Sequence, residues 1–251
     1  MKTKLFNLRK KTASVRFWEI DFARGIAILM MIVFHLVWDL RFFGFISINP
    51  YAGFWGYFQI ATATLFLLLV GLMLAFGAQK YESKYPLHFV KRFGVVFSAA
   101  LLITAVTYII FPQNFIYFGI LHLIAVAILL SIPFAKHRVI PLILGLFFIS
   151  LPHLINLRNI GNNWFFWAGF STPIPTFDFA PLFPWFGAVL IGISIGNLLY
   201  KNCKRRYTIL LPENKSVQFI ISKIQLLGKN SLLVYSNKMG LIPRCLRRPI
   251  L

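Results

Sequence analysis

Acidic residues are scarce in this chain of 251 residues: Asp and Glu together number 6, whereas Lys and Arg number 26. The formal net charge is +20, yet only 13% of the residues are charged and 59% are hydrophobic. A soluble domain averages about a quarter charged residues. Nucleic-acid binding would need a separate basic domain, and the basic residues here lie in short stretches between apolar runs. The composition therefore argues against a water-soluble protein and against a nucleic-acid partner.

Cysteine is scarce as well. Cys203 and Cys245 are the only two, and two distant cysteines form neither a disulfide framework nor a metal-binding box. Cys203 lies in a stretch rich in Lys and Arg, where we interpret it as a free thiol. The sequence also lacks a Gly-rich phosphate loop, a nucleophile elbow and a Cys-based catalytic arrangement. Any catalytic site must therefore be built from other residue types.

Long apolar runs are what the sequence has in abundance. About 20 apolar residues, rising about 1.5 Å each, cross a hydrocarbon core of about 30 Å. Runs of this kind predict spans at 22–46, 54–78, 93–111, 115–134, 138–155 and 180–200. A weaker run, 217–235, is interrupted by Lys223 and Lys229. The expected fold class is all-α, a polytopic transmembrane helix bundle of six to seven spans.

The distribution of basic residues predicts the orientation of the bundle. Most Lys and Arg outside the tail fall in 2–16, 80–92, 136–138 and 201–215, whereas the opposite loops hold only Arg41 and Arg158. Because basic loops stay in the cytoplasm, the N-terminus is expected inside a multi-pass protein of the inner or cytoplasmic membrane. We divide the chain into a basic cytoplasmic segment (1–17), a transmembrane domain (18–235) and an atypical tail (236–251).

Four ionisable residues share one face at the start of, and within, the first predicted helix. Asp21 and Arg24 are spaced i,i+3, His35 and Asp39 are spaced i,i+4, and all four fall on one stripe of a helix. An ionised group in lipid costs several kcal/mol, so this stripe should face the bundle interior or a wet cavity. Arg24 would lie near the inner surface and His35 about 16 Å further along. A carboxylate one turn away can orient an imidazole and raise its basicity, as a general base requires.

Simpler readings of these residues stay open. Arg24 could snorkel to the interface and pair with Asp21 or Glu19. His35 and Asp39 could form a purely structural hydrogen-bonded pair. Either reading would leave the stripe without chemistry.

Two later residues join the candidates. His122 lies about 10 Å below the outer face, close to the level expected for His35, and could instead be a core histidine. Asp178, the only acid in the outer loop 157–179, could join the site or cap the helix that follows it. His35, Asp39, His122 and Asp178 are chemically acceptable metal ligands, but no tight ligand motif supports a metal and none is expected.

Three stretches carry a resemblance to a known family. These are RFWEIDFARGIAILMMIVFHLVWDL (16–40), GILHLIAVAILLSIPF (119–134) and FDFAPLFPWFGAVLIG (177–192). In this order, over about residues 16–235, the chain resembles the heparan-α-glucosaminide N-acetyltransferase catalytic-domain family, in its small prokaryotic branch. More distantly it resembles bacterial membrane O-acyltransferases, in which an Arg-Gly pair is followed about ten residues later by a histidine.

The resemblance implies a transmembrane acyltransferase that takes an acetyl group from cytoplasmic acetyl-CoA to an amino or hydroxyl group of an extracytoplasmic sugar or glycan. It implies a donor-binding role for Arg24 and a catalytic-base role for His35. Arg16 would assist at the phosphates, while Asp39, His122 and Asp178 match recurring polar positions and complete the expected catalytic set. Expected partners are membrane lipids, acyl-CoA and the acceptor. A homodimer is one arrangement that the sequence allows.

The chain departs from the family pattern near its end. After Tyr235 the sequence continues SNKMGLIPRCLRRPIL rather than into a last span with a His-Gln-Pro motif. We therefore also consider an inactive acyltransferase-like protein with an altered or truncated tail. The large lumenal domain of the lysosomal relative is absent, which argues against a polymeric heparan substrate. A further alternative is a non-catalytic transporter or flippase of lipid or sugar carriers that uses the same polar stripe.

Overall fold

A computed structural model describes residues 17–154, 163–170, 175–202, 204–207, 218–219, 221–226 and 228. Six numbered α-helices dominate this part of the chain: α1 (Trp18–Phe42), α2 (Gly53–Tyr81), α3 (Tyr85–Ile110), α4 (Ile120–Leu130), α5 (Ile140–Leu154) and α6 (Leu182–Leu199). Shorter elements are η1 (Glu82–Lys84), η2 (Ile132–Phe134), η4 (Asn163–Ala168), β1 (Tyr200–Lys201) and β2 (Lys204–Arg205). The mostly helical fold predicted from the sequence is confirmed.

The helices differ in whether they are long enough to cross a membrane. Within the described residues, three helical stretches are long and apolar enough: Trp18–Phe42, Gly53–Ile110, which contains α2 and α3, and Leu182–Leu199. The helices found at the fourth and fifth predicted spans are shorter, with 11 residues in α4 and 15 in α5. The count of six to seven spans, and the cytoplasmic N-terminus, therefore stay predictions.

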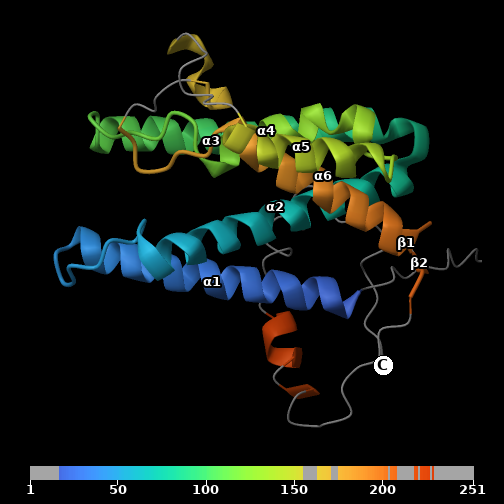
Figure 1. Ribbon diagram of the computed structural model, residues 1–251, viewed down its shortest axis with the longest axis horizontal. Helices are drawn as coiled ribbons and strands as arrows, with labels where there is room; N and C mark the ends of the chain where they lie inside the picture. The colour runs from blue at the N-terminus through green and yellow to red at the C-terminus, as the bar shows by residue number, and fades with distance from the viewer. Residues whose placement is uncertain are drawn as a thin grey trace, which may run out of the picture.

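The helices pack around α6. It contacts α2 along one side and α5 along the other, α3 packs against α4, and α1 lies against α2 (Figure 1). Small residues allow the central crossing to be close: a Cβ at Gly71 would collide with the carbonyl oxygen of Val189, and one at Gly192 with that of Leu68. Close backbone approach at glycine is a common way to pack helices in membranes.

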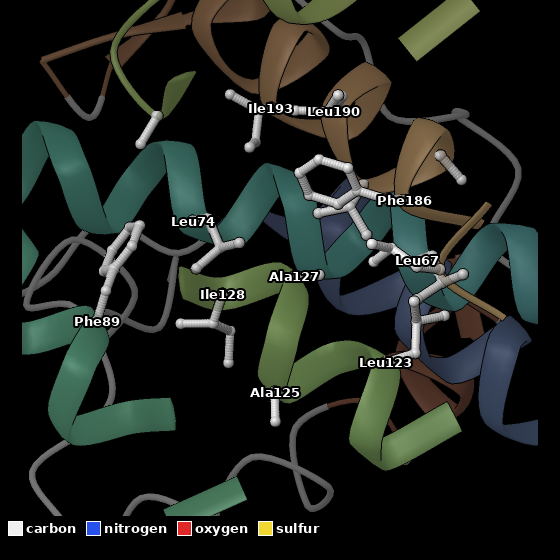
Figure 2. Close-up of a cluster of buried hydrophobic side chains, with 14 of the residues drawn as sticks. Leu67, Leu74, Phe89, Leu123, Ala125, Ala127, Ile128, Phe186, Leu190 and Ile193 are labelled. Atoms are coloured by element: carbon white, nitrogen blue, oxygen red, sulfur yellow. The ribbon is translucent and has the colours of Figure 1, made fainter. Parts of the chain in front are cut away.

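Two apolar clusters hold this arrangement together. The larger one joins α2, α3, α4 and α6 (Figure 2), and its most buried large side chains include Leu67, Leu74, Phe89, Leu123, Ile128, Phe186, Leu190 and Ile193. The smaller one joins the N-terminal end of α1 to α2 and β1 through Phe17, Ile20, Phe76 and Tyr200. After the predicted orientation, we call the N-terminal part of α1 its inner end and the part from residue 31 onward its outer half. The outer half lies outside both clusters.

A pairing between two distant extended segments delays the start of α4. Residues 114–118 run beside 176–180, where Ala180 N donates to Phe118 O at 3.2 Å and the hydroxyl of Thr176 donates to Phe115 O at 2.8 Å. Because 114–118 is not helical and bonds to 176–180 instead, the helix begins at Ile120 rather than at the predicted residue 115. The same pairing places Asp178 beside the first turn of α4.

Candidate functional site

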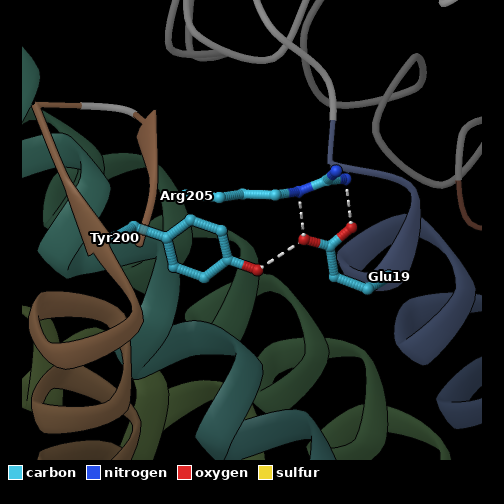
Figure 3. A network of polar contacts seen from close by, with 3 residues as sticks. All are labelled: Glu19, Tyr200 and Arg205. Atoms are coloured by element: carbon cyan, nitrogen blue, oxygen red, sulfur yellow. Dashed lines mark hydrogen bonds and ion pairs between the residues drawn. The ribbon is translucent and has the colours of Figure 1, made fainter. Parts of the chain in front are cut away.

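The inner end of α1 is fixed by a charged network. Arg205 of β2 donates from Nε and Nη2 to the Glu19 carboxylate at 2.9 and 2.6 Å, and the Tyr200 hydroxyl donates to the same carboxylate at 2.8 Å (Figure 3). Burial, followed by the hydrogen bond to Glu19, raises the pKa of the Tyr200 phenol well above its ordinary value. The network ties the chain after α6 to the start of α1.

Arg24 lies one turn further along α1 and is buried. Its side chain approaches the Asp21 carboxylate at 3.5 Å, one of the pairings considered from the sequence. The next residue, Gly25, is crossed by the helical segment 221–226, where a Cβ would collide with the carbonyl oxygen of Ile224. This crossing covers the backbone of α1 beside Arg24. Arg16, the second predicted donor-binding residue, lies outside the described residues, as do Cys203 and Cys245.

His35 lies in the outer half of α1 with its ring oriented by the helix itself. Its Nδ1 lies 2.8 Å from the Met31 carbonyl oxygen, one turn earlier. A carbonyl only accepts, so Nδ1 carries the proton and Nε2 of the neutral ring keeps its lone pair. Asp39 was expected to orient the ring, but in the described structure the ring's hydrogen-bond partner is Met31.

The predicted stripe divides into two parts. Asp21 and Arg24 are buried, as expected, whereas the side chains of His35 and Asp39 are exposed. The reason is that the outer half of α1 meets aromatic side chains along one edge only. Asp21 and Arg24 thus lie in the interior, whereas the expectation that His35 and Asp39 face the bundle interior or a wet cavity stays a prediction.

Tyr51, in the turn before α2, packs against the aromatic edge of α1 and was not predicted from the sequence. The indole nitrogen of Trp38 donates to the hydroxyl of Tyr51 at 3.0 Å, and the Phe34 ring contacts the Tyr51 ring with centroids 6.3 Å apart. Trp38 also meets the Phe177 ring at 5.8 Å. The Asn49-Pro50 turn was visible in the sequence, but the partner of Tyr51 was not. These contacts bring the loop before α2 and the loop before α6 to the edge of α1 formed by Phe34 and Trp38, and the Phe34 ring also meets the neighbouring His35 ring at 5.9 Å.

Asp178 caps a different helix from the one expected. Its Oδ2 accepts a hydrogen bond from Ile120 N at 2.8 Å, so it caps α4 and not α6, which follows it directly. A Cβ at Gly119 would collide with this carboxylate oxygen, so glycine is needed there. Burial raises the pKa of Asp178, while the bond from Ile120 N and the nearby His35 act in the opposite direction. The carboxylate therefore caps α4, and its pKa is sensitive to His35.

His122 is a buried histidine with both ring nitrogens occupied. Gly119 N donates to its Nδ1 at 3.3 Å, and its Nε2 lies 3.2 Å from the Thr104 hydroxyl. Thr104 donates its own proton to Ile116 O at 2.6 Å, so it accepts from Nε2–H. This arrangement fixes a neutral imidazole at the start of α4. The structure brings His122 next to the loop that carries Asp178, and not into contact with His35.

The candidate residues do not form a metal site in the part of the chain that is described. Among those residues, no group of three or more His, Cys, Asp or Glu side chains could hold a metal ion. The described arrangement instead offers a nitrogen lone pair on His35, a half-buried carboxylate on Asp178 and a phenol on Tyr51. Such groups can accept a proton, stabilise the resulting cation and donate a hydrogen bond to a developing anion.

Comparison with known families identifies the chain's relatives. The family model described as heparan-alpha-glucosaminide N-acetyltransferase, catalytic, matches residues 16–238, a range that includes all six numbered helices. Searches of curated proteins and of solved structures gave no match. The resemblance inferred from the three sequence stretches is confirmed, and the chain belongs to the heparan-alpha-glucosaminide N-acetyltransferase catalytic family.

Proposed function

We propose that this protein is an integral membrane acyltransferase that moves an acetyl group from cytoplasmic acetyl-CoA to an amino or hydroxyl group of an extracytoplasmic sugar or glycan. Its family and its long apolar helices support the membrane acetyltransferase class. The observation that carries the proposal for this chain is the state of His35. Its Nδ1–H is held by Met31, which presents Nε2 as a proton acceptor in the outer half of α1.

His35 acts as the general base. Nε2 takes the proton from the acceptor amine or hydroxyl as that group attacks the thioester carbonyl carbon. The new carbon–nitrogen or carbon–oxygen bond forms, the carbon–sulfur bond breaks, and the proton on His35 passes to the CoA thiolate. The products are the acetylated acceptor and free CoA. Asp178 stabilises the transient imidazolium by its charge, since the two groups are electrostatically coupled.

The donor enters from the inner end of α1. The guanidinium of Arg24 is a planar fork of N–H donors suited to phosphate. Arg24 and His35 are about 16 Å apart along the helix, a separation suited to the long thin pantetheine arm of CoA. Arg16 assists at the same phosphates.

The remaining polar residues support the outer pocket. Asp39, exposed one turn beyond His35, attracts a cationic amine of the acceptor. His122 holds the first turn of α4 through Gly119, and this turn in turn holds Asp178. Asp39 is thus assigned to the acceptor, and His122 to the positioning of the carboxylate.

The decisive experiment measures acetyl-CoA binding and turnover by the purified full-length protein in detergent. Glucosamine serves as acceptor and release of the CoA thiol as readout. His35→Ala should lower kcat by about 10²–10⁴-fold, because a general base contributes that much, while acetyl-CoA still binds. Arg24→Ala should weaken binding of acetyl-CoA. His153→Ala, an exposed histidine on α5, is the matched control and should behave like the unaltered protein.

Two outcomes would contradict the proposal. One is an unaltered protein that neither binds nor turns over acetyl-CoA. The other is turnover that His35→Ala leaves unchanged. Ion-coupled movement of a lipid or sugar carrier without release of CoA would support the transporter alternative instead.

A further inference from the structure

Tyr51 is held rigidly in the turn that leads into α2. Its backbone N–H donates to the Asn49 side chain at 3.0 Å, and Ala52 N donates to Asn49 O at 3.3 Å. Pro50 between them is buried and restricts the backbone further. The phenol is therefore presented from a preorganised turn, which is what a site that stabilises a transition state requires.

The Tyr51 hydroxyl has its acceptor side occupied and its proton available. Trp38 Nε1–H donates to the phenol oxygen at 3.0 Å. Indole nitrogen is only a donor, so this bond fixes the oxygen and leaves the O–H to donate elsewhere. Among the described residues, the structure shows no acceptor for that proton. If another protein group accepted this proton, the Tyr51 hydroxyl could not donate it in a hydrogen bond to the substrate.

Tyr51 lies on the other side of the Phe34 ring from the proposed base, His35. Phe34 separates it from His35: the Phe34 ring meets the His35 ring at 5.9 Å and the Tyr51 ring at 6.3 Å. Partial burial raises the pKa of Tyr51, the hydrogen bond from Trp38 lowers it, and the nearby Asp178 charge raises it. Asp178 is itself coupled to His35. The Phe34 ring thus contacts both the proposed base and the phenol of Tyr51, which is 54% exposed and stays protonated at neutral pH.

We propose that Tyr51 is a further catalytic residue, which donates a hydrogen bond from its hydroxyl to the thioester carbonyl oxygen during acyl transfer, and that Trp38 is the positioning residue that aims it. This proposal rests on the proposed acyltransferase function. As the acceptor attacks, negative charge develops on the carbonyl oxygen, and the Tyr51 O–H stabilises it without losing its proton. The proton of the acceptor still goes to His35 and then to the CoA thiolate.

The test compares single substitutions in the full-length protein, with acetyl-CoA as donor, glucosamine as acceptor and release of CoA thiol as readout. Tyr51→Phe should lower kcat by about 10²–10³-fold, the usual effect of removing one oxyanion donor, and leave KM for acetyl-CoA nearly unchanged. Trp38→Phe retains the phenol but not its orientation, so it should lower kcat by less, again without a change of KM. Tyr57→Phe, an exposed tyrosine on α2, is the matched control and should match the unaltered protein.

Thermal unfolding and acetyl-CoA binding distinguish catalysis from folding. A folded Tyr51→Phe variant that binds acetyl-CoA and has lost kcat supports the role. If Tyr51→Phe does not fold, Trp38→Phe decides: a fall in kcat at constant KM supports the role, and an unchanged kcat overturns it. Equal kcat for Tyr51→Phe and the unaltered protein overturns the role of Tyr51 alone. Absence of turnover by the unaltered protein overturns the proposed function and this role together.

Discussion

The two halves of α1 differ in how the protein treats their ionisable groups. At the inner end, Glu19 accepts from Arg205 and Tyr200, and Arg24 is buried beside Asp21. In the outer half, His35 and Asp39 are exposed, and the ring of His35 is bonded through one nitrogen to its own helix.

This difference separates structural from chemical uses of charge on one helix. Charges that are taken out of water need partners, and the inner groups have them. A group that must exchange a proton needs a lone pair that no neighbour occupies, and His35 keeps one. Changes at the inner end should therefore affect stability and donor binding first, whereas changes in the outer half should affect turnover.

Gly25→Ala should produce the largest loss of stability at the inner end. The added Cβ would collide with the backbone of Ile224, which a rotamer change cannot relieve, so the crossing of segment 221–226 must shift. Overpacking of this kind costs about 1–3 kcal/mol. Thermal unfolding in detergent measures the loss, and a parallel titration with acetyl-CoA should show weaker binding beside Arg24.

Gly94→Ala is the matched control for that substitution. Gly94 also lies inside a helix, but a Cβ there would meet nothing within 4 Å. Alanine is the better helix former, so Gly94→Ala should be neutral or slightly stabilising. Equal stability of the Gly25 and Gly94 variants would show that the crossing is not tight, and the contrast between the two halves of α1 would lose its main support.

Glu19→Gln should produce a smaller loss at the same end. It keeps an acceptor for Tyr200 but removes the charge that pairs with Arg205, whose side chain is 27% exposed. Because partial exposure screens the pair, we expect the substitution to lower the free energy of unfolding by about 1 kcal/mol. Added salt should make this loss smaller. Glu82→Gln, at an exposed position in η1, controls for the change in net charge. A loss that does not depend on salt would contradict the electrostatic explanation.

The positions of the helices could be predicted from the sequence because lipid imposes a simple rule on it. Long apolar runs must become helices, and each predicted span has a helix near it. The late start of α4 could not be predicted, since it depends on pairing between 114–118 and 176–180. These two segments are about sixty residues apart, and no local pattern encodes their meeting.

The candidate site divides in the same way. The spacing of Arg24 and His35 was readable because both belong to one helix. Asp39 was expected to be the hydrogen-bond partner of His35, but the partner is the backbone carbonyl of Met31. Every residue has a backbone carbonyl, so residue types alone could not single out this one. Tyr51 and the cap made by Asp178 depend on contacts between loops and distant helices, which become visible only when the chain is folded.

Asp178→Asn should give the smallest effect on stability, which is detected as a change in how the free energy of unfolding depends on pH. Asparagine can still accept from Ile120 N, so the cap on α4 is retained while the charge is lost. Burial raises the pKa of Asp178 above its ordinary value of 3.8, so the folded protein holds this proton more tightly than the unfolded chain does. The unaltered protein should therefore lose stability as the pH rises above 3.8, until the folded carboxyl is fully ionised. Asp178→Asn lacks this component, and the difference between the two stability curves isolates it.

Asp39→Asn makes the same change of charge at an exposed position and so separates burial from net charge. A difference curve that is flat or of opposite sign would mean that Asp178 is not held in a desolvated site, and would weaken its assignment as the half-buried counter-charge of His35.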